Sequence, residues 1–272
     1  GNAMVKAAYS CGKPALGVGA GNVPAYVEKT CVLPRAVNDI VLSKSFDNGM
    51  ICASEQAAIV DQEIYSDFMK EIKRFHVYFV NKEEKAKLEK FMFGAEAYSA
   101  NVVGKPAEWI AEQAGFKVPA ETQIICAECK EVGPNEPLTR EKLSPVLAIL
   151  KAKSTDDGIA KAAAMVEFNG LGHSAAIHTE DHEISKKFGH ACKAIRIIEN
   201  APSTFGGIGS VYNAFIPSLT LGCGSYGHNS VSNNVSAVNL INIKRIGRRN
   251  NNMQWVKLPP KVYFEKNSIR YL

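Results

Sequence analysis

The sequence lacks any apolar stretch that approaches the roughly 20 residues needed to cross a bilayer, which argues against a membrane-spanning helix. It also lacks the shape of a secretory signal peptide, because its first four residues lead directly into a helix-like segment at residues 5–9. No segment resembles a nucleic-acid-binding module. These absences predict a cytoplasmic protein that binds neither a membrane nor a nucleic acid.

Cysteine is present, but not in the pattern of a disulfide or metal framework. Seven cysteines, an odd number at irregular spacings, predict reduced thiols rather than paired ones. Cys126 and Cys129 form one Cys-x-x-Cys, and no second pair stands at zinc-finger spacing, so no metal is predicted. The net charge of +5 is modest, and its densest cluster, at residues 244–249, is expected to be a solvated basic segment.

Apolar residues make up 46% of the 272 positions, which is enough for one large domain or two smaller ones. Short apolar runs alternate with amphipathic segments, a pattern typical of an α/β fold. A strand entering a glycine-rich turn is expected within residues 13–22, and further strands at residues 23–28, 57–61, 122–127, 146–150, 172–178 and 194–198. Helices are expected at residues 1–10, 34–46, 63–75, 82–93, 106–114 and 155–170.

One cysteine is distinguished by its neighbours, because Cys52 follows an Asn-Gly turn and precedes an apolar run at residues 57–60. Asn48-Gly49 tolerates positive φ, so the helix that begins at Pro34 is expected to stop there and present Cys52 on a short exposed segment. Backbone N–H groups at such a turn are expected to lower the pKa of the thiol, which makes it a nucleophile, and to hold an oxyanion. The alternative is that Cys52 is a small buried core residue.

Residues 47–56 resemble the active-site stretch of the coenzyme A-acylating aldehyde dehydrogenases, most closely the aldehyde dehydrogenase half of bifunctional aldehyde-alcohol dehydrogenases. By that resemblance, Cys52 is the catalytic thiol. Further segments resemble the same family in the same order, at residues 4–10, 12–22, 141–145, 170–174, 206–209, 219–230 and 255–264.

The resemblance implies a three-layer αβα catalytic domain of the aldehyde dehydrogenase type, joined to an incomplete remnant of a Rossmann-like cofactor domain. The remnant is expected at residues 1–32, the catalytic domain at 33–215, and a returning segment and linker at 216–272. Residues 255–264 resemble the linker that leads to an iron-dependent alcohol dehydrogenase half. The chain is therefore expected to be a fragment, and whether it is active by itself stays open.

The glycine-rich stretch at residues 17–21 is not a dinucleotide fingerprint, because the strand-turn-helix context and a later acidic ribose partner are missing. The resemblance nevertheless places Gly17 and Gly19 beside the cofactor. In hydrolytic aldehyde dehydrogenases, the position that aligns with Gly17 holds a glutamate that activates water. Without that carboxylate, the thioester is expected to survive until coenzyme A takes the acyl group.

Two more residues receive roles through the resemblance. Glu141 begins a Glu-x-x-x-Pro motif, whose glutamate accepts hydrogen bonds from the nicotinamide ribose hydroxyls. His173 matches a Gly-His-Thr motif, with Ser174 in place of threonine, and is a candidate to move the proton of the incoming thiol or of the thiohemiacetal oxygen. His173 and His178 are an odd number of positions apart on an expected strand, so they are predicted to point to opposite faces and to share no metal.

The function implied is reversible, NAD-dependent oxidation of acetaldehyde to acetyl-coenzyme A through a thioester on Cys52. The implied partners are a small aldehyde and an acyl-coenzyme A, with self-association into filaments as in full-length relatives. The glycine-rich loops at residues 203–209 and 219–230 are placed near the substrate tunnel. Two alternatives stay open: a hydrolytic aldehyde dehydrogenase, which needs a water-activating carboxylate near Cys52, and a non-catalytic assembly module.

Overall fold

A computed structural model describes residues 2–94, 100–250 and 266 of the chain. The chain divides into a compact unit, Gly1–Asn239, and a second unit, Leu240–Leu272. The linker predicted at residues 255–264 lies outside the described residues, and the domain boundaries expected after residues 32 and 215 stay a prediction. Within the described part of the chain, no helix has the length and apolar character needed to cross a membrane.

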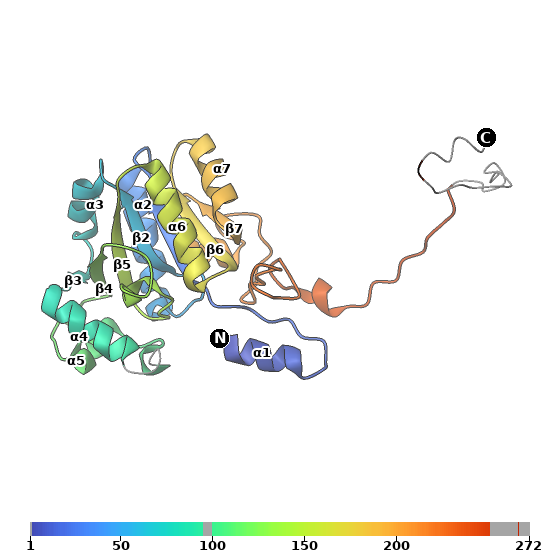
Figure 1. Ribbon diagram of the computed structural model, residues 1–272, viewed down its shortest axis with the longest axis horizontal. Coiled ribbons are helices and arrows are strands. Elements are labelled where there is room, and N and C mark those ends of the chain that lie inside the picture. The colour runs from blue at the N-terminus through green and yellow to red at the C-terminus, as the bar shows by residue number, and fades with distance from the viewer. Residues whose placement is uncertain (1, 95–99, 251–265, 267–272) are drawn as a thin grey trace. The chain divides into compact units, whose positions relative to one another are not determined.

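The compact unit is built on a sheet of seven parallel strands in the order β3-β4-β5-β2-β1-β6-β7 (Figure 1). The strands are β1 Val23–Val27, β2 Glu55–Asp61, β3 Val77–Phe79, β4 Ile124–Cys129, β5 Val146–Ala152, β6 Gly172–His178 and β7 Ala194–Glu199. The central strands β1, β2 and β6 are buried at every position. Burial on both faces explains why these strands read as almost continuous apolar runs.

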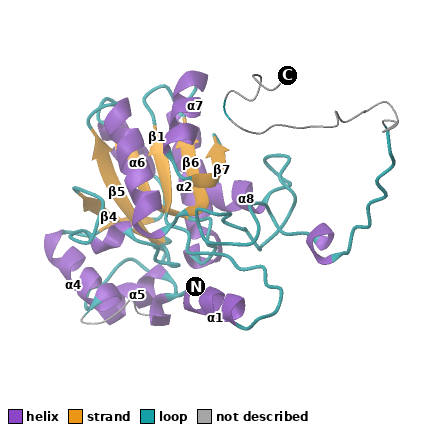
Figure 2. Cartoon of the chain, turned by 45° about the vertical axis from the view of Figure 1, so that its right-hand side comes forward, coloured by secondary structure: helices purple, strands orange, loops and turns teal. Residues whose placement is uncertain are grey.

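Helices cover both faces of this sheet, as Figure 2 shows. They are α1 Asn2–Ser10, α2 Leu33–Ser45, α3 Tyr65–Ile72, α4 Lys82–Phe93, α5 Ala107–Ala114, α6 Thr155–Asn169, α7 His182–Ala191 and α8 Ser203–Ile208. Short 3₁₀ turns occur at η1 Phe46–Gly49, η2 Ala100–Val102, η3 Pro137–Thr139 and η4 Ala237–Leu240. Polar side chains cap α4 and α6, since the Asn81 side chain accepts from the N–H groups of Glu83 and Glu84, and the Ser154 side chain accepts from the Asp157 N–H.

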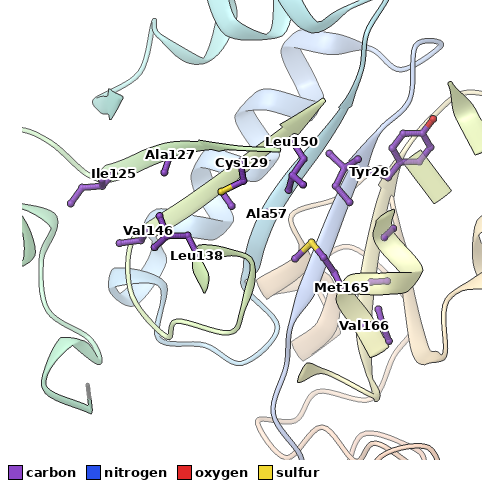
Figure 3. Close-up of a cluster of buried hydrophobic side chains, with 14 of the residues drawn as sticks. Tyr26, Ala57, Ile125, Ala127, Cys129, Leu138, Val146, Leu150, Met165 and Val166 are labelled. Atoms are coloured by element: carbon purple, nitrogen blue, oxygen red, sulfur yellow. The ribbon is translucent and has the colours of Figure 1, made fainter. Parts of the chain in front are cut away.

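Alternate residues of the strands enter two separate apolar cores. Tyr26 and Ile59 pack with α4, α5, α6 and α7 on one face, and Figure 3 shows part of this cluster from Tyr26 across to Ile125. Ala58 and Val60 pack with α2 and α3 on the opposite face. This period-two division between two helical layers is the predicted three-layer αβα architecture, and it is confirmed.

The parallel sheet brings the predicted site residues to one edge. Cys52 precedes β2, Glu141 precedes β5, and His173 lies at the start of β6. Because β1, β2, β5 and β6 are neighbours and run in the same direction, all of these strand starts lie at the amino edge of the sheet. The topology therefore collects residues that are up to 121 positions apart in the sequence, the separation between Cys52 and His173.

Two local predictions are wrong. No strand forms at residues 13–22, where the chain is an irregular loop whose N–H groups bond to side chains rather than to a neighbouring strand. The glycine-rich loop expected at residues 203–209 is instead largely the helix α8, whose first N–H donates to the buried Glu55 carboxylate. That long-range bond satisfies a helix start that has no local cap.

Candidate active site

Cys52 follows a left-handed turn that ends the helix α2 at the predicted place. Asp47, Asn48 and Gly49 have φ values of 51°, 51° and 66°, which only Asn, Asp and Gly adopt readily. The Asn48 amide donates to the carbonyl oxygen of Gly104 at 3.0 Å, and this bond anchors the turn. The chain then bends again before β2, where the Ser54 N–H donates to the Ile51 carbonyl at 2.8 Å.

Cys52 and Glu141 lie in one cleft of about 320 Å³. The Cys52 side chain is half-buried, so the prediction of an exposed segment is wrong, because neighbouring loops fold over the turn. Gly19 also borders the cleft, whereas Gly17 and His173 do not. The remaining lining is mostly apolar and consists of Val18, Ala20, Met50, Ile51, Leu143, Ile208, Leu219 and Leu221.

Gly21 joins the three predicted site residues through close contacts. Its N–H donates to the Glu141 carboxylate at 2.7 Å. A Cβ built on Gly21 would stand well inside 3.0 Å of the Cys52 carbonyl oxygen, a separation that real side chains essentially never show, and 3.2 Å from Cε1 of His173. Its φ lies outside the left-handed region, so glycine is required here for closeness and not for backbone conformation.

His173 is fully buried beside this cleft. Its Nδ1 lies 3.1 Å from the Ser174 hydroxyl, and its Nε2 has no hydrogen-bond partner among the described residues. Burial, together with the nearby Arg196 cation, lowers the pKa of His173 to about 3, so the ring is neutral at physiological pH. His178 is buried at the other end of β6, and no group of three or more His, Cys, Asp or Glu in the described part of the chain is placed to hold a metal.

The expected activation of Cys52 by its turn is not what the structure shows. Burial raises the pKa of the Cys52 thiol to about 11, and the negative charges of Glu141 and Cys223 raise it further, whereas Arg196 and a backbone hydrogen bond lower it. The prediction failed because it considered the turn alone and not the loops that remove water from the sulfur. In this arrangement the thiol is protonated at neutral pH.

Known proteins match both the sequence and the fold, although no protein-family model matches the chain. An aldehyde-alcohol dehydrogenase of Streptococcus pneumoniae serotype 4 is 71% identical over 281 aligned residues, which include all of this chain and 32% of that protein. The solved acetylating aldehyde dehydrogenase of Geobacillus thermoglucosidasius is 43% identical with a TM-score of 0.89. The chain is similar in sequence and fold to part of the acylating aldehyde dehydrogenases.

The chain spans about a third of the length of the curated relatives that it matches over its whole length. It covers 56% of the acetylating aldehyde dehydrogenase from Geobacillus, which in turn covers 96% of this chain. A propionaldehyde dehydrogenase of Rhodopseudomonas palustris, solved with bound coenzyme A and an acylated cysteine, is 28% identical with a TM-score of 0.72. The match therefore covers a region of each family member and not its whole length.

Carboxylates near Cys52 decide whether a water could be activated against a thioester at this sulfur. Gly17 carries no carboxylate, and it faces α1 rather than the cleft, because its N–H donates to the Tyr9 hydroxyl at 2.9 Å. The cleft nevertheless holds one carboxylate among its described lining residues, that of Glu141. Burial raises the pKa of Glu141, and the hydrogen bond from Gly21 opposes this rise. The resemblance assigns this carboxylate to the nicotinamide ribose, so the expectation that no carboxylate activates water against the thioester stays a prediction.

A buried polar cluster lies next to Glu141, and no pattern in the sequence indicates it. The Lys142 ammonium donates to the carbonyl oxygens of Gln56, Leu138 and Arg140 at 2.9, 2.5 and 2.9 Å. The Lys142 N–H also donates to the Gln56 side-chain oxygen at 3.0 Å. These bonds fix the main chain next to Glu141. Read in sequence, Glu-Lys-Leu-Ser-Pro resembles a solvated surface turn, so the burial of the lysine was not predictable locally.

Glu55 makes the stability of the fold depend on pH. It is fully buried at the start of β2, and burial raises its pKa from 4.5 to about 7. A raised pKa means that the protonated form stabilises the fold fully below pH 4.5, and that this stabilisation is lost as the pH rises through 7.

In Glu55→Gln the unfolding free energy should fall less than in the parent between about pH 5 and about pH 8. Urea titrations across this range measure the difference, and the exposed Glu63→Gln should match the parent. A parallel decline in both variants and the parent would contradict the assignment.

Proposed function

We propose that the whole protein is an NAD-dependent aldehyde dehydrogenase that transfers the acyl group of a short aldehyde to coenzyme A through a thioester on Cys52. The observation that carries the proposal is the cleft shared by Cys52 and Glu141, since it sets a thiol beside a carboxylate that can accept from hydroxyl groups. The relatives support the acyl acceptor, because one carries bound coenzyme A and an acylated cysteine. Self-association of the whole protein is part of the proposal and rests on the resemblance.

The proposed chemistry proceeds through bonds to one sulfur. The Cys52 sulfur adds to the aldehyde carbon and the thiol proton moves to the aldehyde oxygen, which gives a thiohemiacetal. A nicotinamide dinucleotide, when bound, would supply the acceptor for the hydride of this carbon, and loss of the hydroxyl proton to solvent would leave a thioester on Cys52. The thiolate of coenzyme A then displaces the Cys52 sulfur and departs as acyl-coenzyme A. Each step is reversible, so the same residues serve acyl-coenzyme A reduction.

The residues around the sulfur fit this role in size and polarity. The cleft volume of about 320 Å³ and the apolar side chains of Met50, Leu143 and Leu221 suit a short apolar acyl chain and limit the access of water. The Glu141 carboxylate fits the ribose of a nicotinamide nucleotide, because Gly21 occupies one of its oxygens and the carboxylate keeps further acceptor positions. Solved relatives include an engineered glycolyl-coenzyme A reductase with bound NADP⁺.

The decisive experiment is the dependence of product on coenzyme A. The whole protein is mixed with acetaldehyde and NAD, with and without coenzyme A, and NADH, acetyl-coenzyme A and acetate are measured. We expect NADH beyond one turnover only with coenzyme A, in equal amount to acetyl-coenzyme A. Steady NADH formation with acetate as the product would identify a hydrolytic enzyme, and the absence of NADH in both mixtures would favour an assembly module.

Hydrolysis is the second candidate, because Glu141 lies in the Cys52 cleft with a raised pKa, which is the condition of a general base. Glu141→Gln separates the two roles of this carboxylate. If Glu141 holds the ribose, the variant should raise the KM for NAD by about tenfold or more, because a hydrogen bond to a charged acceptor is weakened. The ratio of acetate to acetyl-coenzyme A should stay unchanged. Steady-state kinetics with product analysis measures both quantities.

A matched control for this substitution is Glu121→Gln, which removes the charge of an exposed glutamate that does not line the cleft. Its KM for NAD is expected to equal that of the parent. A Glu141→Gln variant with unchanged KM and selectively lost acetate formation would assign Glu141 to water activation instead.

A further inference from the structure

Arg196 is a buried cation outside the roles described so far. It lies on β7 with 3% of its surface exposed. Its Nε donates to the Asn234 side-chain oxygen at 2.8 Å, Nη1 donates to the His173 carbonyl oxygen at 2.7 Å, and Nη2 donates to the carbonyl oxygen of Gly222. All three acceptors are neutral, and no carboxylate among the described residues forms an ion pair with Arg196. Burying a charge that only neutral oxygens accept from costs folding free energy. This cost indicates that Arg196 has a functional role.

The three acceptors of Arg196 belong to segments that frame the Cys52 cleft. Its Nη1 holds the main chain of His173, whose ring contacts the Gly21 position beside Cys52. Its Nη2 bond to Gly222 holds the chain next to Leu221, which lines the cleft. Removing the guanidinium fork would therefore free both the main chain at His173, beside the cleft, and the cleft lining at Leu221.

Asn234 extends this arrangement to a second part of the cleft lining. While its side-chain oxygen accepts from Arg196, its amide donates to the carbonyl oxygens of Gly207 at 3.0 Å and Ile216 at 2.8 Å. The segment between these two carbonyls includes Ile208, another residue of the cleft lining. Arg196 and Asn234 thus form a buried hydrogen-bonded pair that holds the segments next to the cleft.

The charge of Arg196 acts on the same sulfur. Cys52 faces two groups that carry negative charge when ionised, Glu141 and Cys223, and both oppose loss of its proton. Arg196 is the cationic side chain that opposes them at Cys52, and it also acts on Cys223. In turn, Cys52 and Cys223 favour the charged form of Arg196, whose pKa burial lowers. His173 is kept neutral in part by the same guanidinium.

We infer that Arg196 is a positioning residue of the thiol site: its guanidinium fixes the loops that frame the cleft and supplies the positive charge that stabilises the Cys52 thiolate. The two contributions are separable, because lysine keeps a cation but cannot reproduce the planar three-way fork. The inference rests on the proposed function, since that function makes Cys52 the nucleophile. It assigns to Arg196 a task that neither the cleft lining nor the resemblance assigns.

Alkylation of Cys52 by iodoacetamide tests this inference without turnover. The whole protein and its variants Arg196→Met and Arg196→Lys are alkylated between about pH 7 and about pH 10, where the rate follows the thiolate fraction. Peptide mass spectrometry separates Cys52 from the exposed Cys11, which serves as the reference in the same sample. We expect Arg196→Met to slow the alkylation of Cys52 about tenfold at each pH, the effect of about one pKa unit. Cys11 should be unaffected.

Arg196→Lys keeps the inference testable if the methionine variant does not fold. It should alkylate Cys52 within about threefold of the parent rate, because the charge is retained, whereas kcat/KM should still fall because the fork is lost. A lysine variant as slow in alkylation as the methionine variant, or a folded methionine variant at the parent rate, would overturn the inference. A parent that forms no acyl-coenzyme A but shows the alkylation pattern would overturn the proposed function and leave the role of Arg196 intact.

Discussion

Replacing Cys52 by alanine should abolish coenzyme A-dependent NADH formation by the whole protein. The expected loss in kcat is at least about a thousandfold, because the covalent thioester cannot form and no later step has a substrate. Binding should survive, since the sulfur contributes only part of a cleft that is otherwise formed by other side chains. Steady-state NADH formation measures the loss, and intact-protein mass spectrometry after incubation with acetyl-coenzyme A should show an acetyl group on the parent only.

Cys31→Ala is the matched control for this prediction. Cys31 is also a half-buried free thiol, and burial raises its pKa to about 12, so it resembles Cys52 in both respects. It does not line the cleft. The control should keep kcat within about threefold of the parent, because the acyl group never meets it. A Cys52→Ala variant as active as the Cys31→Ala variant would remove the thiol from the mechanism and favour a scaffold role.

The features that could be predicted from sequence are those decided by near neighbours in the chain. Asn48-Gly49 ends α2 in left-handed conformations, and Asn81 with Glu84 caps α4, because each depends on side chains within a few residues. Six of the seven strands were predicted from their apolar runs, whereas the short, half-buried strand β3 was not. The resemblance predicted the fold of the whole compact unit, which local patterns alone leave at the level of an α/β class.

The features that escaped prediction depend on contacts between distant segments. Lys142 and Arg196 are charged residues that sequence reasoning assigns to the surface, yet both are buried among carbonyl oxygens supplied by other loops. The high pKa of Cys52 has the same origin, since it reflects loops from distant parts of the chain, at residues 18–20, 141–143 and 219–221. The sequence can therefore nominate the thiol and the carboxylate, but the electrostatic surroundings that set their protonation need the assembled fold.

Gly21→Ala should disable the site with a single added methyl group. The methyl carbon would overlap the Cys52 carbonyl oxygen, which is backbone and cannot rotate away, and would press on the His173 ring. The turn that carries Cys52 must then shift by about 1 Å, and a shift of this size near reacting atoms typically costs about a hundredfold in rate. Overpacking of the site should also lower the unfolding free energy by about 1–3 kcal/mol. Steady-state kinetics and urea unfolding measure the two effects.

The effect expected of Gly21→Ala depends only on how closely other atoms approach Gly21, so the control is a glycine with ordinary space around it. Gly189 in α7 provides one, because a Cβ built there meets only Cγ1 of Ile197, at 3.8 Å. Gly189→Ala should leave kcat unchanged and stabilise the protein by up to about 1 kcal/mol, since alanine favours a helix over glycine. If Gly21→Ala kept full activity, the loop at residues 17–21 could not be packed against the Cys52 turn, and the site built from Cys52, Glu141 and His173 would lose the contact that joins them.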